Sequence, residues 1–336
     1  MALDVQVRIS STSVAGRVGF GIPLILVSKA SAAVAYTECS SLSEVGTACG
    51  NTSEAYKAAE LLFKQDNAPE KIAVYASTGT ALVALAEVIG KEWRQLIVIK
   101  GAEDETTNAD IATYIEDKVG KIYYVTVSTT AELTALAGKT RTFAFYYDLK
   151  ENNVLVAPNA VAAVVGATAG RAAGSFTYKN IIIKGLEPLE LTDATVNQIH
   201  TGKGNTLLLK SGDVVVSNGI NTDGEFLDII DSEDWIIQQI TYNSQKLLNT
   251  SDKLPYTNAG IGALESVTRG VLQEAFTNGM IATDEDGVTP LFSVDFKPRS
   301  AMSVADRQAR VYSGGNFTFT LAGAIHTAEI NGELII

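Results

Sequence analysis

The chain has 336 residues, of which 46% are hydrophobic and 19% are charged, whereas about a quarter of an average globular protein is charged. A composition this apolar can form a sizeable core and excludes a chain that is disordered throughout. The 38 acidic residues outnumber the 26 basic residues and give a net charge of −12. This balance argues against binding to nucleic acid or to an anionic membrane, because both need a basic surface.

The first predicted element is a strand at residues 4–9, where apolar and polar side chains alternate with the period of two that is typical of strands. It has no partner nearby, because a stretch rich in serine and glycine follows at residues 10–21. The apolar run 22–27 predicts a buried strand. Residues 18–27 also resemble the apolar core of a signal peptide, but Pro23 within the run and Lys29 after it favour the strand.

Between residues 50 and 150 the sequence alternates between predicted helices and predicted strands. Strands that alternate with helices of this length are typical of βαβ units. We therefore expect a mostly parallel sheet with helices on its faces. The helices are predicted at residues 52–64, 80–93, 108–119 and 131–137, and the strands at residues 71–75, 96–99, 122–127 and 142–147.

The remainder of the chain begins with a helix of small residues at 157–173, which we expect to pack very closely on a neighbouring element. Two long helices are predicted at residues 231–248 and 258–279, and Gly279 is a typical stop signal. No apolar run is long and uncharged enough to predict a membrane span. The shorter elements are a helix at 192–200 and strands at 181–183, 207–209, 214–216, 317–321, 325–330 and 333–336.

The chain is poor in the side chains that usually catalyse reactions or bind metals. Its two histidines, His200 and His326, are far apart and have no cysteine or second histidine at ligand spacing. Cys39 and Cys49 match neither a zinc site nor a redox motif, so we expect free thiols in a reducing compartment. We expect no cofactor, no metal and no enzymatic activity.

One loop could still bind a phosphate. Residues 77–80 follow a predicted strand and open a helix, where backbone N–H groups can hold an anion. No cation stands beside this loop, so ordinary capping of the helix by serine and threonine is the favoured interpretation. Residues 138–140 resemble the end of a P-loop, but the earlier glycine that this motif needs falls on Leu133.

Four carboxylates gather near the start of the first long helix. Negative charge is favourable there because the N-terminal end of a helix carries a partial positive charge. We interpret the group as a solvated capping cluster rather than as an acid–base pair. Its members are Asp228, Asp231, Glu233 and Asp234.

A series of features runs from about residue 155 to the end of the chain. Pro158 opens the small-residue helix, and Asn258 opens a long helix that ends in Gly279. The other features are the segment 176–180, Leu191-Thr192, Gly204-Asn205, the segment 226–240 and the strands within 317–330. In this order they resemble the contractile tail sheath proteins of bacteriophages and phage-tail-like particles. The sequence departs from that family at residues 230–233, which lack a basic pair, and at residues 324–327, which lack a Pro-Ala-Glu turn.

The resemblance implies an α/β and α+β protein of three parts. They are an N-terminal linker arm at residues 1–21, an outer, mostly parallel α/β domain at residues 22–152, and an α+β sheath core domain at residues 153–336 that ends in a strand. Copies of such a protein stack as helically related hexameric rings around a tail tube. Contraction then drives the tube through a target envelope.

The resemblance also implies partners and a location. The partners are other copies of the chain, the tail tube protein, and the baseplate and tail terminator proteins, with no nucleic acid and no membrane. The location is a virion tail or a phage-tail-like particle that is made in the cytoplasm of a bacterial host.

Two segments that lack a partner within the chain suit this role. The strand at residues 5–9 and the apolar C-terminal end can each add to the exposed sheet edge of a neighbouring copy. The serine- and glycine-rich stretch 10–21 would be the hinge. The residues that we expect to exchange between subunits are Val5, Gln6, Val7, Arg8, Ile9, Ile330, Leu334, Ile335 and Ile336.

Two other functions remain open from the sequence. The first is an α/β enzyme that binds a phosphate-bearing ligand at Ser77–Thr80; a thermal shift with a nucleotide or a flavin would favour it. The second is an exported surface or filament protein that uses residues 18–27 as its signal; a cleaved N-terminus would favour it.

Overall fold

The computed structural model describes residues 21–330, and residues 1–20 and 331–336 lie outside the described part. The chain divides by packing into two compact units, one that ends at Pro255 and one that begins at Tyr256. Elements after residue 152 pack with the sheet of the first unit, so this packing does not separate the two domains predicted on either side of residue 152. The predicted boundary concerns the assembled protein and stays a prediction.

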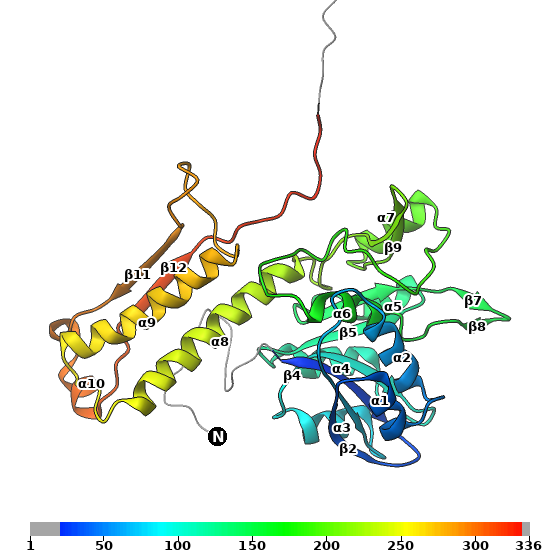
Figure 1. The fold of residues 1–336 in the computed structure, drawn as a ribbon, viewed down its shortest axis with the longest axis horizontal. Coiled ribbons are helices and arrows are strands. Elements are labelled where there is room, and N and C mark those ends of the chain that lie inside the picture. The colour runs from blue at the N-terminus through cyan, green and yellow to red at the C-terminus, as the bar shows by residue number, and fades with distance from the viewer. Residues whose placement is uncertain (1–20, 331–336) are drawn as a thin grey trace, which may run out of the picture. The chain divides into compact units, whose positions relative to one another are not determined.

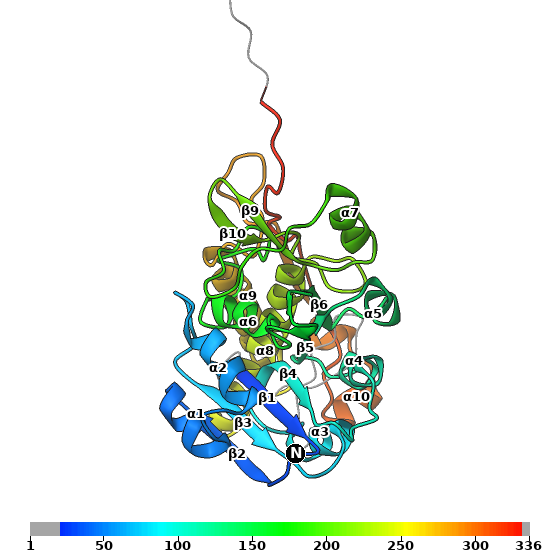
Figure 2. The ribbon, with the colours of Figure 1, turned by 90° about the vertical axis from the view of Figure 1, so that its right-hand side faces the viewer.

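The first unit is built on a six-stranded sheet (Figure 1). Five of its strands are parallel, and β2 runs antiparallel to β3 at one edge. The apolar run that also resembles a signal peptide forms β1, which lies between β3 and β4 (Figure 2). In sheet order, the strands are β2 (Val34–Cys39), β3 (Ile72–Ala76), β1 (Ile22–Ser28), β4 (Trp93–Lys100), β5 (Ile122–Val127) and β6 (Thr142–Tyr146). The mostly parallel sheet is as predicted.

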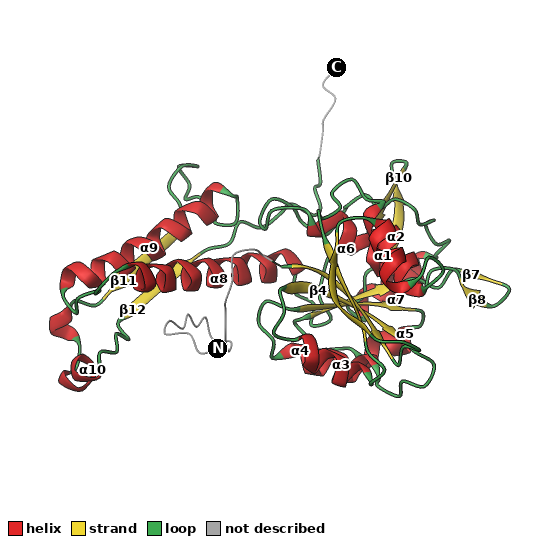
Figure 3. Ribbon diagram, turned by 60° about the horizontal axis from the view of Figure 1, so that its bottom comes forward, coloured by secondary structure: helices red, strands yellow, loops and turns green. Residues whose placement is uncertain are grey.

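Helices cover both faces of this sheet (Figure 3). Successive strand residues point to opposite faces, so Ile25 and Ile97 join one hydrophobic core and Leu24 and Leu96 join the other. Burial on both faces explains why the strands are apolar without alternation. Helices α1 (Leu42–Cys49), α2 (Glu54–Phe63) and α6 (Val161–Ala169) contribute to the first core, and α3 (Ala81–Val88), α4 (Asn108–Glu116) and α5 (Thr130–Ala135) contribute to the second.

The helix predicted at residues 80–93 is shorter than expected. It ends at Val88, and Trp93 is the first residue of β4. The indole N–H of Trp93 donates to the carbonyl of Val88 at 2.7 Å, so the aromatic ring turns back against the helix end without being part of the helix. Strand β2 and helix α1 were not predicted from the sequence.

The small-residue helix α6 packs as closely as its sequence predicts. Nearly all of its residues are buried. A Cβ atom at Gly166 would lie 2.2 Å from the backbone carbonyl oxygen of Leu62 in α2, so only glycine fits there. The prediction of a close packing surface is confirmed.

The first unit continues with short elements and one long helix. Residues 181–183 form only an isolated bridge between Ile182 and Val215 in place of the predicted strand. A tight turn at Ser211 and Gly212, both with positive φ, joins β9 to β10 as expected. The elements are β7 (Lys150–Glu151), β8 (Val154–Leu155), α7 (Asp193–Thr201), β9 (Leu207–Lys210), β10 (Asp213–Val216) and α8 (Leu227–Thr250).

The second unit consists of a long helix, a two-stranded antiparallel sheet and a short helical segment. Helix α9 begins after Thr257, whose hydroxyl accepts a hydrogen bond from the backbone N–H of Gly260. Residues 325–330, which were predicted as a strand, are irregular. The elements are α9 (Asn258–Thr277), β11 (Phe292–Phe296), the 3₁₀ helix η1 (Arg299–Ala301), α10 (Val304–Ala309) and β12 (Gly315–Phe319). Within residues 21–330, no helix combines the length and the apolarity that crossing a membrane requires.

Candidate functional site

Most of the residues expected to exchange between subunits lie outside the described part of the chain. This holds for Val5, Gln6, Val7, Arg8 and Ile9 and for Leu334, Ile335 and Ile336. Ile330 is described and is 92% exposed, and Ile325 in the same irregular segment is 88% exposed. The structure thus shows an extended C-terminal segment whose large apolar side chains are not buried within the chain.

The two-stranded sheet of the second unit has one apolar face and one polar face. Residues Phe292, Val294 and Phe296 of β11 pair with Phe319, Phe317 and Gly315 of β12, so their side chains share one face. This face is half-buried and its sheet packs on α9, whereas the exposed face carries polar side chains such as Asp295 and Thr318.

The backbone bonding of this sheet defines its free edge. Lys297 N–H donates to Gly314 O at 3.0 Å, and Thr320 N–H donates to Leu291 O at 2.9 Å. Bonded and non-bonded pairs alternate in an antiparallel ladder, so the backbone groups of Gly315, Phe317 and Phe319 point away from β11. Within residues 21–330, no hydrogen bond outside the strand pair uses these groups.

The edge of β11 differs from that of β12. Arg269 of α9 donates to the carbonyl of Val294 at 3.4 Å, so one outward acceptor of β11 is already engaged. The outer edge of β12 is therefore the more open of the two. An open strand edge is a template for pairing with another chain.

A second feature of the chain is a buried ionic network in the first unit. Arg94 of β4 contacts Asp231 and Asp234 of α8, and its Nη1 lies 2.7 Å from Asp234 Oδ2. Arg141, which precedes β6, makes two hydrogen bonds to Asp234 of 2.8 and 2.9 Å. All four side chains are buried. The network joins the first turns of α8 to the sheet.

Tyrosines extend this network. The hydroxyl of Tyr178 donates to Asp231 at 2.8 Å and lies 2.9 Å from the hydroxyl of Tyr124. Burial, and after it the charge of Asp231, raises the pKa of Tyr178 well above its usual value, so Tyr178 is a hydrogen-bond donor at neutral pH. Burial alone would raise the pKa of Asp234, but Arg94 and Arg141 outweigh it and lower that pKa, so Asp234 is ionised.

The interpretation of the four carboxylates as a solvated cluster is wrong for Asp231 and Asp234. Helix α8 starts at Leu227, so these two residues lie one turn apart on the same face, and both meet buried arginines. Sequence reasoning missed Arg94 and Arg141. The two arginines balance the two aspartates, and the arrangement is that of a structural clamp rather than of an acid–base pair.

The loop at Ser77–Thr80 is poorly suited to a phosphate. The backbone N–H of Ala81, the first residue of α3, donates to Asp104 at 2.9 Å. The Ser77 hydroxyl donates to Glu87 at 3.3 Å, so a second carboxylate is close. These carboxylates take the donors that an anion would need and would repel it.

Other candidate chemistry is sparse in the described part. Cys39 and Cys49 are both free, as predicted. His200 lies 2.9 Å from the hydroxyl of Ser217, and burial, with Lys179 and Lys210, lowers its pKa. Within residues 21–330, no group of three or more histidines, cysteines and acidic residues could hold a metal ion.

Comparisons with known proteins agree with this architecture. Residues 227–334 match the family model of the C-terminal domain of proteins like the E217 tail sheath protein gp31. A comparison with curated protein sequences finds no match.

Solved structures that resemble most or all of the chain include three sheath proteins. The helical sheath of the anti-feeding prophage in its contracted state has a TM-score of 0.69 at 12% identity and covers 100% of this chain and 99% of its own. A sheath complex of the extracellular contractile injection system PVC, also contracted, has a TM-score of 0.69 at 12% identity, and the match covers 99% of this chain and 97% of that protein. The sheath tail protein Lin1278 from Listeria innocua has a TM-score of 0.61 at 11% identity, and the match covers 91% of this chain and 96% of that protein.

At these identities the structures establish the fold, and the family model adds a match in sequence over the C-terminal third. The family model begins at Leu227, which is also the first residue of α8. Over the described residues 21–330 the chain therefore has the fold of contractile tail sheath proteins, and it resembles that family in sequence from α8 onward.

Proposed function

We propose that this chain is the structural subunit of a contractile tail sheath. Copies polymerise as helically related hexameric rings around a tail tube, within a virion tail or a phage-tail-like particle that is made in a bacterial cytoplasm. Contraction of the sheath drives the tube through a target envelope. The baseplate and tail terminator proteins bound the polymer at its ends, and the subunit has no enzymatic role.

The observation that carries this proposal is the open edge of β12. The sheet has only two strands in the described part of the chain, so a third strand could extend it at the unpaired edge of β12. No residue between 21 and 330 bonds the outward backbone groups of Gly315, Phe317 and Phe319, so such a strand could bond them, and the neighbouring face is aromatic. A neighbouring copy can supply the strand, which is the mode of recognition called β-augmentation.

The terminal segments have the sequence that such a strand needs. Val5, Val7 and Ile9 alternate with Gln6 and Arg8, so one face of the added strand would be apolar and the other polar. The apolar side chains would continue the row of Phe317 and Phe319. The C-terminal segment, with its exposed Ile330, offers a second strand to another copy.

The arms can be tested by deletion. We expect that removing residues 1–10, or residues 331–336, blocks polymerisation and leaves a folded monomer, because the described helices and strands all lie between residues 22 and 319. Electron microscopy reads out the tubes, and circular dichroism confirms the fold. Tubes formed by both truncated proteins would overturn the strand-exchange proposal.

A matched pair of substitutions sharpens the test. Val7→Asp places a charge on the apolar face of the expected strand, whereas Gln6→Asp places the same charge on its polar face. We expect the first to prevent tube formation and the second to permit it. Equal effects of the two would contradict the predicted strand geometry.

A further inference from the structure

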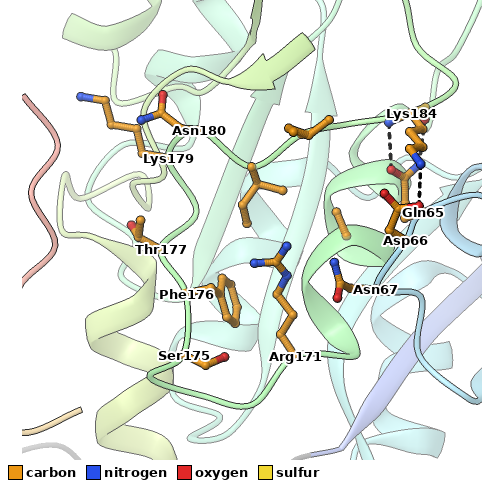
Figure 4. A pocket seen from close by; sticks show the side chains of 13 residues that line it. Gln65, Asp66, Asn67, Arg171, Ser175, Phe176, Thr177, Lys179, Asn180 and Lys184 are labelled. Atoms are coloured by element: carbon orange, nitrogen blue, oxygen red, sulfur yellow. Dashed lines mark hydrogen bonds and ion pairs between the residues drawn. The ribbon is translucent and has the colours of Figure 1, made fainter. Parts of the chain in front are cut away.

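The first unit contains a polar pocket of about 350 Å³ (Figure 4). It lies where α2 and α6 end, and the segment 175–184 closes its other side. Arg171 reaches into the pocket from beyond the end of α6, between Phe176 and Asn67. This pocket is separate from the ionic network and from the sheet edge of β12.

The Arg171 side chain is only partly buried and has few partners in the described part of the chain. Its Nε is buried and has no hydrogen-bond partner, and its guanidinium makes no ion pair with any residue between 21 and 330. Its remaining contact is with the ring of Phe176, whose centroid lies 5.5 Å from the guanidinium carbon. A buried donor without an acceptor is destabilising, and the Nε–H of Arg171 is such a donor in the described part of the chain.

The charges that line the pocket leave an excess of positive charge. Lys184 is paired with Asp66, the single acidic residue of the lining, at 2.5 Å. Lys179 makes no ion pair in the described part of the chain. Arg171 and Lys179 therefore have no paired carboxylate among residues 21–330.

The surroundings of Lys179 are also basic. Lys210 donates to Asn180 of the pocket lining at 3.0 Å. Burial, and after it the charge of Lys179, lowers the pKa of Lys210. Two lysines thus lie close enough to repel each other at one side of the pocket.

We propose that this pocket binds a carboxylate side chain of another copy of the chain. A guanidinium matches the geometry of a carboxylate through two parallel hydrogen bonds, and the ring of Phe176 lies against the guanidinium of Arg171. Each copy carries 38 acidic residues against 26 basic ones, so neighbouring copies supply carboxylates in excess. The inference rests on the proposed self-assembly and adds a charged contact to it.

The first test measures assembly of the full chain. Losing a charge-assisted pair weakens association by at least about tenfold, so we expect Arg171→Gln to raise the critical concentration for tube formation by that factor. Arg171→Lys keeps the charge but loses the forked N–H donors of the guanidinium, so its critical concentration should lie between those of the wild type and Arg171→Gln. Lys150→Gln, in the exposed strand β7, makes the same change in net charge and serves as the control.

The second test detects binding without assembly. In a monomer labelled with ¹⁵N at arginine, the Nε–H resonance of Arg171 should shift saturably on titration with acetate, and the resonance is assigned by its loss in Arg171→Lys. A shift that does not saturate, or none beyond that produced by chloride at the same ionic strength, would mean that water alone fills the pocket and would overturn the inference.

The outcomes separate this inference from the proposed function. If the wild-type chain forms tubes and Arg171→Gln forms them at the same concentration, the pocket proposal is wrong and the sheath proposal stands. If the wild-type chain forms no tubes under any condition, the sheath proposal fails and a contact between copies fails with it.

Discussion

The buried ionic network makes a strong prediction about stability. Asp234→Ala removes a carboxylate that accepts one hydrogen bond from Arg94 and two from Arg141. Arg141 then has no counterion in the network, and Arg94 keeps only Asp231. Breaking a buried pair from one side costs about 3–5 kcal/mol, because the remaining charge stays buried. Since a domain is typically stable by about 5–15 kcal/mol, a large share of the stability would be lost.

Urea unfolding followed by tryptophan fluorescence measures this effect. The chain has two tryptophans, Trp93 and Trp235, and each is the sequence neighbour of a network residue, Arg94 or Asp234. The control is Lys57→Gln, which breaks an exposed pair of 2.7 Å with Glu54 in the same unit. An exposed pair contributes at most about 1 kcal/mol. A loss in Asp234→Ala no larger than that in Lys57→Gln would refute the reasoning.

The same network predicts a dependence on pH. The pKa of Asp234 lies below its ordinary value of 3.8 in the folded chain. Its contribution to stability is therefore fully present above pH 3.8 and is lost as the pH falls through the lower pKa of the folded state. The difference in unfolding free energy between the wild type and Asp234→Ala should shrink in that acidic range and stay constant from pH 5 to pH 7.

Two further substitutions test the packing and the electrostatics of the first unit. Gly166→Ala places a Cβ atom 2.2 Å from Leu62 O and should lower the free energy of unfolding by about 1–3 kcal/mol or more. The control is Gly262→Ala in α9, where nothing lies within 4 Å of the added Cβ atom, and this change should not lower stability. Equal changes in melting temperature would contradict the close packing of α6 on α2. Burial, and after it the charge of Arg94, lowers the pKa of Lys121 from 10.5 to about 7. Between pH 7 and pH 10.5 the unfolded chain therefore binds more protons at Lys121 than the folded chain does. Raising the pH from 7 to 9 should then stabilise the wild type by roughly 2 kcal/mol relative to Lys121→Met. A difference that does not change with pH would show that Lys121 stays charged in the folded protein.

The sheet and its helices were largely predictable because their signal is local. Strand β5 was predicted with the bounds that the structure shows, since an apolar run between polar turns has few alternatives. Strand β2 was missed because it is an edge strand, and most of its side chains are at least partly exposed, so its apolar pattern is weak. Trp93 was assigned to the wrong element because a tryptophan packs equally well at a helix end or in a strand.

The functional features were less predictable because they depend on distant pairs. Arg94 and Asp231 are 137 residues apart in sequence, and Arg141 and Asp234 are 93 apart. A lone arginine beside a strand does not reveal its partner, so the carboxylates looked like a solvated cluster. The strand pattern of residues 5–9, which has no local partner, is visible in the sequence alone, but the exchange of the arms between copies stays a prediction because residues 1–20 and 331–336 lie outside the described part.

Helix α8 has consequences for how this protein can be divided. By packing it belongs to the first unit, which ends at Pro255, whereas the family model of the C-terminal domain begins at its first residue. A fragment cut at Leu227 would contain Asp231 and Asp234 but neither of the arginines that neutralise them. Two carboxylates would then face solvent on a helix surface shaped for burial. An exchange of the α/β domain between proteins of this fold must therefore carry Arg94 and Arg141 together with the two aspartates. A chimaera that separates the arginines from the aspartates would have unbalanced charges where its two parts join.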